Sequence, residues 1–334
     1  MPLTIPDMLL ERLSKTVERS IILKKALYMS GIKAVSQEKR MKIYLCMHAG
    51  LCQGAQVAVD TAYENLSENL YMYGEVLHNP TVISQLKEKG AKIIRSVNEV
   101  RFLENKKEIT VLIRAHGVAK SVIDALEEEG IHYLDRTCKE VKKIHDIVAE
   151  KSRQGYRIII VGSKTHPEVV GTAGWVMGEP ILIQDMEEAK NVIPALTEAE
   201  ARFCVVAQTT YNFKKYREII EYCKENLQKA EYFNTVCMDT ENRQTELAKL
   251  SRQADAVIVI GGKNSSNSNK LYKIALKYCR NVQFIETYKE LDFSGIDEKS
   301  FVVIASGAST PEGVIDQVKE CLRGFSRDMK SPLV

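Results

Sequence analysis

Short apolar stretches alternate with amphipathic stretches along the chain from residue 41 onward. The apolar stretches have the length and composition of buried strands and fall at residues 41–47, 92–96, 109–115, 157–163, 203–208, 256–262 and 301–306. Apolar residues at helical spacing occupy the segments between them, at residues 80–90, 120–130, 214–227, 270–279 and 312–322. This alternation predicts an α/β fold with mainly parallel sheets.

Polar loops follow the predicted strands, and they form a repeat of three units. Each unit offers a cysteine loop and then two further loops, at Cys52, His78, His116; Cys138, His166, Thr209; and Cys237, Ser265, Ser309. The second loop follows the cysteine by 26, 28 and 28 residues, and the third by 64, 71 and 72 residues. In parallel α/β sheets such loops gather at the carboxyl ends of the strands.

The repeat predicts three similar small α/β domains around a pseudo-threefold axis, with all nine loops facing one central cavity. The predicted domains are residues 41–137, 138–236 and 237–334. Residues 1–40 precede them as an N-terminal helical extension, because apolar residues recur at helical spacing between residues 9 and 28.

Composition and charge exclude several classes of protein. The net charge is only +3, and residues 1–40 hold eight Lys and Arg against four Asp and Glu, so the remainder is close to neutral. This balance argues against nucleic-acid binding. No apolar run is long enough to span a membrane, and no secretory signal is present. We therefore expect a cytoplasmic protein without a membrane partner, while its oligomeric state stays open.

The eight cysteines suggest metal or redox chemistry, because a disulfide framework is not expected in a reducing compartment and no CxxC pair is present. Cys52, Cys138 and Cys237 precede helical patterns, where the helix dipole favours a thiolate. Three such thiolates suit an iron–sulfur cluster with one open iron. A three-cysteine zinc site and purely structural cysteines remain alternatives. The other five cysteines are predicted to be buried.

Two small-residue loops resemble an anion site. Ser265, Ser266 and Asn267 stand just before a predicted helix, and Ser309 lies in a second such turn. Hydroxyl and amide donors at a helix N-terminus bind phosphate oxygens well. Helix capping is the simpler explanation for either loop alone.

Three histidines occupy matching strand ends in the repeat. His78, His116 and His166 each could serve as an ordinary loop hydrogen-bonding residue, but together with the serine loops they predict diphosphate recognition or acid–base work. Glu168 is the one carboxylate within this set of loops, and a raised pKa there would suit a proton donor. Stabilisation of a helix N-terminus is its simpler role.

Between about residues 41 and 322 the chain resembles the 4-hydroxy-3-methylbut-2-enyl diphosphate reductase family, also called LytB/IspH. The specific motifs are THPEVVGT (165–172), KNSSNSN (263–269), NRQ (242–244), AHGV (115–118) and ASGAS (305–309). The resemblance implies three α/β domains around a pseudo-threefold axis, with a central [4Fe–4S] cluster. It also implies two-electron removal of an allylic hydroxyl to give isopentenyl and dimethylallyl diphosphate, with ferredoxin or flavodoxin as electron donor.

The resemblance also assigns roles to residues. It makes Cys52, Cys138 and Cys237 the cluster ligands, leaving one iron open. The substrate contacts that it implies are His78, His116, His166, Thr209, Thr240, Asn242, Ser265, Ser266, Asn267 and Ser309. Glu168 would supply protons together with Thr209, and His166 would assist them.

Four positions depart from the family pattern, namely Leu51, Gln53, Lys139 and Glu241. All four stand beside the cysteine loops, so they could alter the choice of substrate. Two alternatives to the reductase therefore stay open: a divergent paralogue acting on another substrate, and a cluster-binding sensor or scaffold without turnover.

Overall fold

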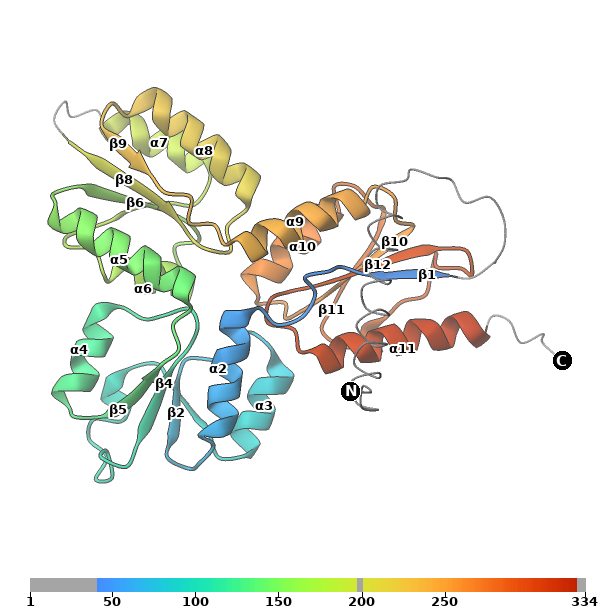
Figure 1. Ribbon diagram of the computed structural model, residues 1–334, viewed down its shortest axis with the longest axis horizontal. Helices are drawn as coiled ribbons and strands as arrows, with labels where there is room; N and C mark the ends of the chain where they lie inside the picture. The colour runs from blue at the N-terminus through green and yellow to red at the C-terminus, as the bar shows by residue number, and fades with distance from the viewer. Residues whose placement is uncertain (1–40, 197–200, 329–334) are drawn as a thin grey trace, which may run out of the picture. The chain divides into compact units, whose positions relative to one another are not determined.

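The computed structural model describes residues 41–196 and 201–328 (Figure 1). The predicted helical extension, residues 1–40, lies outside the described residues. Within the described ranges the strands form three four-stranded sheets, and every strand pair in them is parallel. The predicted α/β class with three similar parallel-sheet units is therefore confirmed.

The three sheets share one strand order. The first sheet is ordered β3 (Lys92–Ile94), β2 (Leu70–Tyr73), β4 (Thr110–Ile113), β5 (His132–Asp135). The second is ordered β7 (Ile181–Ile183), β6 (Arg157–Val161), β8 (Phe203–Ala207), β9 (Ala230–Tyr232). The third is ordered β11 (Asn281–Ile285), β10 (Ala256–Ile260), β12 (Phe301–Ser306), β1 (Lys42–Leu45).

Helices cover both faces of each sheet, and this explains why the central strands are apolar on both sides. The first sheet carries α2 (Gln53–Glu64), α3 (Pro80–Glu88), η1 (Val97–Glu99) and α4 (Lys120–Glu128). The second carries α5 (Lys139–Arg153), α6 (Pro167–Ala173), α7 (Met186–Val192), η2 (Ile193–Leu196) and α8 (Phe213–Asn226). The third carries α9 (Met238–Leu250), α10 (Ser266–Ala275), η3 (Tyr288–Glu290) and α11 (Glu312–Asp328).

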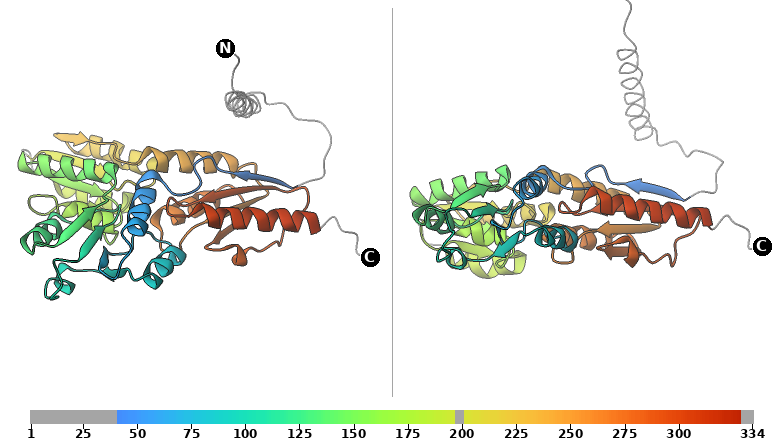
Figure 2. Two further views of the ribbon diagram at one scale, coloured as in Figure 1. Left: turned by 60° about the horizontal axis from the view of Figure 1, so that its bottom comes forward. Right: turned by 90° about the horizontal axis from the view of Figure 1, so that it is seen from below.

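The cores follow directly from this layering. Alternate residues of β10 illustrate it, since Val257 and Val259 pack against α9 and α10 while Ile258 and Ile260 pack on the side of α11. Figure 2 shows α11 lying along the third sheet. None of the helices in the described ranges combines the length and apolar character that a bilayer-spanning segment needs.

Strand β1 differs from the predicted domain division. The sequence places it in the first domain, residues 41–137, but it pairs with β12 as an edge strand of the third sheet, with Lys42 opposite Phe301. It thus occupies the edge position that β5 and β9 hold in the other two sheets. A repeat in the sequence cannot reveal this pairing, because β1 precedes the first repeat unit and β12 lies in the last one. The remaining domain boundaries stay predictions.

Candidate active site

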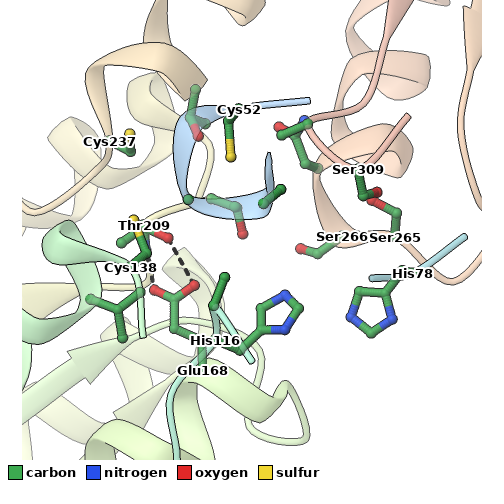
Figure 3. Close-up of a pocket in the computed structure, with 18 of the residues that line it drawn as sticks. Cys52, His78, His116, Cys138, Glu168, Thr209, Cys237, Ser265, Ser266 and Ser309 are labelled. Carbon is green, nitrogen blue, oxygen red and sulfur yellow. Dashed lines mark hydrogen bonds between the residues drawn. The ribbon is translucent and has the colours of Figure 1, made fainter. Parts of the chain in front are cut away.

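One cavity lies where the loops of all three sheets meet, and Figure 3 shows it in close-up. All nine predicted loop residues line it, namely Cys52, His78, His116, Cys138, His166, Thr209, Cys237, Ser265 and Ser309. Glu168, Thr240, Ser266 and Asn267 line it as well. We call the part with the three thiols the cysteine end. The anion end is the part with His78, His116, His166, Ser265, Ser266, Asn267 and Ser309.

The three cysteines occupy equivalent positions. Each follows the edge strand of one sheet and is the N-cap of the helix that begins the next unit, α2, α5 or α9. Each backbone N–H donates to a carbonyl of the neighbouring loop at about the same distance: Cys52 to Ala308 (3.1 Å), Cys138 to Ala115 (3.0 Å) and Cys237 to Thr209 (2.9 Å). The repeat therefore directs three thiols into one cavity at three helix N-termini.

The electrostatics of the cysteine end reflect this convergence. Burial raises the pKa of the Cys138 thiol, and the backbone N–H of Glu140 acts in the opposite direction. Burial likewise raises the pKa of Cys237, opposed by the N–H of Asp239. The negative charge of a Cys52 thiolate would raise the pKa of both thiols further. Three partly buried thiols in one cavity can all ionise only where a cation or metal cluster balances their charge.

Gly54 allows the cysteine end to close. A Cβ at this position would lie 2.8 Å from the Cys138 sulfur, closer than carbon and sulfur can pack. The first turn of α2 can therefore approach Cys138 only because residue 54 has no side chain. Cys52, two residues earlier, is brought into the same cavity as Cys138.

The three histidines form a cluster at the anion end. Their ring centroids lie 5.0 Å (His78–His116), 5.4 Å (His116–His166) and 6.3 Å (His78–His166) apart. One ring nitrogen from each falls within 4.8 Å of the others. Such a cluster could hold a divalent metal ion, or it could donate hydrogen bonds to an anion.

Burial keeps these imidazoles neutral. It lowers the pKa of His166 to about 3 and that of His116 well below 6.5, and nearby positive groups act in the same direction. The pKa of His78 is lowered mainly by burial and then by Arg114. His166 Nδ1 accepts the backbone N–H of Glu168 at 3.2 Å, so its Nε2 carries the ring proton and is free to donate.

Several buried polar atoms of the anion end lack a partner among the described residues. They are Nδ1 of His116, both amide atoms of Asn267 and the hydroxyl of Ser309. Buried polar groups are normally hydrogen-bonded, so a group of unpaired ones in a cavity indicates a bound ligand. Hydroxyl and amide groups at the start of α10, together with the imidazoles that line the same cavity, suit a phosphate group.

Glu168 and Thr209 form a buried pair between the two ends. The Glu168 carboxylate accepts hydrogen bonds from the Thr209 backbone N–H at 2.5 Å and from the Thr209 hydroxyl at 2.8 Å. Glu168 is only 2% exposed. Burial raises the pKa of Glu168, opposed by the two Thr209 bonds and by Lys270. A carboxyl that burial shifts toward the protonated form can donate a proton within the cavity.

Lys270, which the sequence analysis did not single out, reaches this pair from the third sheet's helix α10. Its ammonium donates to the Thr210 carbonyl at 2.6 Å, and burial lowers its pKa to about 8. It therefore fastens the Thr209–Thr210 loop across the contact between two units. A basic residue seven positions after Lys263 in the serine–asparagine motif was the available signal.

Asn242 is the one predicted site residue that does not line the cavity. It is exposed in the second turn of α9, whereas Thr240 and Asp239 line the cavity. Glu140 and Asp239 were missed, although both stand two residues after a cysteine. That shared spacing was the signal for them, because the second residue after each N-cap faces the same cavity.

The NRQ motif that contains Asn242 has a structural role. Arg243 pairs with Asp239 at 2.7 Å and donates to the Ser306 carbonyl at 3.2 Å. Gln244 accepts the Phe213 N–H and donates to the Tyr211 carbonyl, both at 3.3 Å. The motif therefore fixes α9 to strand β12 and to the loop after Thr209.

The remaining cysteines lie away from the cavity. Cys46, Cys204, Cys223 and Cys279 are buried as predicted, whereas Cys321 on α11 is partly exposed. The described residues thus separate three cavity thiols from five packing cysteines.

Comparisons with known proteins agree with this architecture. The LytB protein family model matches residues 43–323. The 4-hydroxy-3-methylbut-2-enyl diphosphate reductase of Caldanaerobacter subterraneus subsp. tengcongensis is 39% identical over 289 residues, which cover 85% of this chain and 98% of that protein. The protein of the same name from Aquifex aeolicus is 36% identical over 286 residues, covering 83% of this chain and 94% of the relative.

Two solved structures are also similar. One is described as (E)-4-hydroxy-3-methyl-but-2-enyl diphosphate reductase, the terminal enzyme of the non-mevalonate pathway; it is 33% identical, with a TM-score of 0.62, and covers 85% of this chain and 99% of that one. The other is the E-1-hydroxy-2-methyl-but-2-enyl-4-diphosphate reductase from Plasmodium falciparum, 25% identical, with a TM-score of 0.77, covering 88% and 89%. With a family match across nearly all of its described residues, the chain belongs to the LytB protein family.

Proposed function

We propose that this protein reduces 4-hydroxy-3-methylbut-2-enyl diphosphate to isopentenyl and dimethylallyl diphosphate. The reaction takes up two electrons and two protons, replaces the allylic C–O bond with C–H and releases water. The observation that carries the proposal is one cavity in which three equivalent N-capping thiols, a buried carboxyl and an unsatisfied anion site all converge.

Cys52, Cys138 and Cys237 would hold a [4Fe–4S] cluster with one iron free of protein ligands. The donor set fits this group, because three thiols at helix N-termini line one cavity and no fourth cysteine lines it among the described residues. When bound, the cluster supplies electrons and a Lewis-acidic iron. Zinc is the alternative metal for three thiols.

The anion end would bind the diphosphate. Asn267, Ser309 and His116 offer buried polar atoms without protein partners, and Ser265 and Ser266 stand at the start of α10. The same contacts would orient the allylic hydroxyl toward the cysteine end. Glu168 would then donate a proton through the Thr209 hydroxyl, with which it already shares a 2.8 Å hydrogen bond.

The positions of the four departures from the family pattern are compatible with 4-hydroxy-3-methylbut-2-enyl diphosphate as the substrate. None of Leu51, Gln53, Lys139 and Glu241 is among the residues that line the cavity. Gln53 and Lys139 are exposed, and Leu51 packs on the core of the first sheet. This arrangement favours the reductase over a paralogue with altered substrate choice.

We further propose that ferredoxin or flavodoxin supplies the electrons, in the cytoplasm.

An anaerobic assay tests the function. Protein reconstituted with iron and sulfide should consume the hydroxymethylbutenyl diphosphate when a strong chemical reductant is present and form both products. A sensor or scaffold would bind the diphosphate without consuming it, and a divergent paralogue that acts as a lyase would release product without reductant. Either result would contradict the proposal.

A Glu168→Gln variant tests the proton donor. It should retain iron and sulfide but lose turnover by about 100-fold or more, because the amide cannot donate an acidic proton. Glu187→Gln, at an exposed position on α7, is the matched control and should behave like the unaltered protein. Unchanged turnover in Glu168→Gln would remove this residue from the mechanism.

A further inference from the structure

A second hollow lies outside the active site, between α8, α9 and α10. Its lining carries five basic side chains and a single acidic one, Glu218. The basic residues are Lys214, Lys215, Lys249, Arg252 and Lys277, and all five are exposed. Since the charge of the chain after residue 40 is close to zero, this concentration of positive charge is a local feature.

We propose that this basic hollow docks the protein that brings electrons to the active site, a small acidic carrier with a one-electron iron–sulfur or flavin group. The inference rests on the proposed function, because only a reductase needs such a partner. Two docking events, each oxidising one reduced carrier by one electron, supply the two electrons that with two protons convert C–OH to C–H and water.

Tyr278, on the rim of the hollow, lies beside two of its basic residues. The Arg252 guanidinium lies 4.6 Å from the centre of the Tyr278 ring. A hydrogen bond from Arg252, then the charge of Lys214, lowers the pKa of the Tyr278 phenol. Groups that favour a phenolate also favour carboxylates on a partner surface.

Two short covalent routes connect the hollow with Cys237. The first is α9 itself, since Gln244 in the hollow is seven residues from this N-capping cysteine, or about 10 Å along the helix axis. The second is the loop from Thr209 to Asn212, because the Thr209 carbonyl accepts the Cys237 N–H at 2.9 Å. A carrier seated in the hollow would therefore face the backbone that holds one of the cavity thiols.

Gln244 joins the two routes. It is only 5% exposed, and its side-chain amide bonds the backbone on both sides of Asn212, at Tyr211 and Phe213. The floor of the hollow is thus a hydrogen-bonded bridge between α9 and the loop that contains Thr209. A rigid floor beneath a ring of exposed cations suits brief docking, because electron-transfer encounters use small, polar interfaces steered by charge.

Charge reversal tests the docking surface. Holoenzyme with Lys214→Glu, Lys215→Glu and Lys277→Glu is compared with holoenzyme carrying Lys87→Glu, Lys107→Glu and Lys190→Glu, three exposed lysines away from the hollow. The first readout is binding of oxidised ferredoxin at low ionic strength, measured by titration calorimetry without turnover. The second is kcat/KM for reduced ferredoxin, beside turnover with a small chemical reductant.

The hollow variant should bind ferredoxin at least about tenfold more weakly and lose a similar factor in ferredoxin-driven kcat/KM, since charge steers such encounters. Its turnover with the chemical reductant should stay within about twofold of the control, and salt should weaken binding only where the cations remain. Equal ferredoxin binding by both variants, or tighter binding of double-stranded DNA than of ferredoxin by the unaltered holoenzyme, would overturn the proposal. Failure of the unaltered holoenzyme to consume the diphosphate with either reductant would instead overturn the proposed function, and the calorimetry would still decide the docking surface.

Discussion

The cysteine end and the anion end of the cavity come from the same threefold repeat but have kept its symmetry to different degrees. At the cysteine end each sheet presents the same residue, at the same N-cap, with the same backbone hydrogen bond. At the anion end the matching positions have diverged, to His78, His166 and Ser265 after the first central strand of each sheet. The proposed cluster would take one thiolate at each of three irons and so would suit three like ligands, whereas the proposed diphosphate is elongated and would need different contacts along its length.

Removing any one thiol gives the largest expected effect, and it tests the equivalence of the three loops. Each of the variants Cys52→Ala, Cys138→Ala and Cys237→Ala should lose most of its iron and sulfide. Turnover should fall by more than about 100-fold, because the loss of a ligand costs more than the loss of a residue that only supports a ligand. Cys321→Ala, at a partly exposed position on α11, should retain both. If one of these three variants kept its full iron content, the three cysteine loops would not be equivalent to one another.

A smaller effect is expected at the anion end, where each residue makes its own contacts. Asn267→Ala should raise KM for the diphosphate about 10- to 100-fold, because hydrogen bonds to charged groups contribute about 1.5–3 kcal/mol. Iron content should not change, in contrast with the cysteine variants. Asn226→Ala on α8, whose amide bonds the Tyr222 carbonyl away from the cavity, is the control. Loss of iron in Asn267→Ala would show that the two ends are not independent.

The smallest expected effect is a pH dependence of anion binding, which should distinguish the anion end from the cysteine end. The free imidazoles are neutral at pH 7, because burial holds the pKa of His166 at about 3 and lowers that of His116 well below 6.5. A bound diphosphate raises these pKa values, so each imidazole that becomes protonated in the complex takes up one proton and adds affinity as pH falls from 8 toward 6.

The expected gain is at most about tenfold per pH unit for each proton taken up. Calorimetry with inorganic diphosphate in buffers of different ionisation enthalpy measures that uptake directly. His166→Asn should reduce it. Binding at a pH-independent affinity, with no contribution from buffer ionisation, would show that the imidazoles stay neutral in the complex and would contradict the expected protonation.

The sequence was sufficient for the repeat and for most of the cavity, because loops after parallel strands must meet at one sheet edge. It was not sufficient to predict which residues of α9 face the cavity, because this depends on the rotational phase of the helix. With Cys237 as N-cap, Thr240 faces the cavity, and Asn242 lies about 200° further round the helix. That phase depends on where the helix begins, which is a tertiary result of the Cys237–Thr209 hydrogen bond. Cys138's contact with Gly54 likewise has no signal in a single chain.

The pairing of β1 with β12 has a consequence for the order in which the protein is made. Cys52 is synthesised early, but the strand before it finds its partner only when residues near Phe301 have left the ribosome. Until then the ring of units is open, and Ala308 is not yet there to accept the Cys52 N–H. The cavity can therefore close around Cys52 only after residues near Phe301 and Ala308 have been made, and a nascent chain released before then would leave β1 as an unpaired strand.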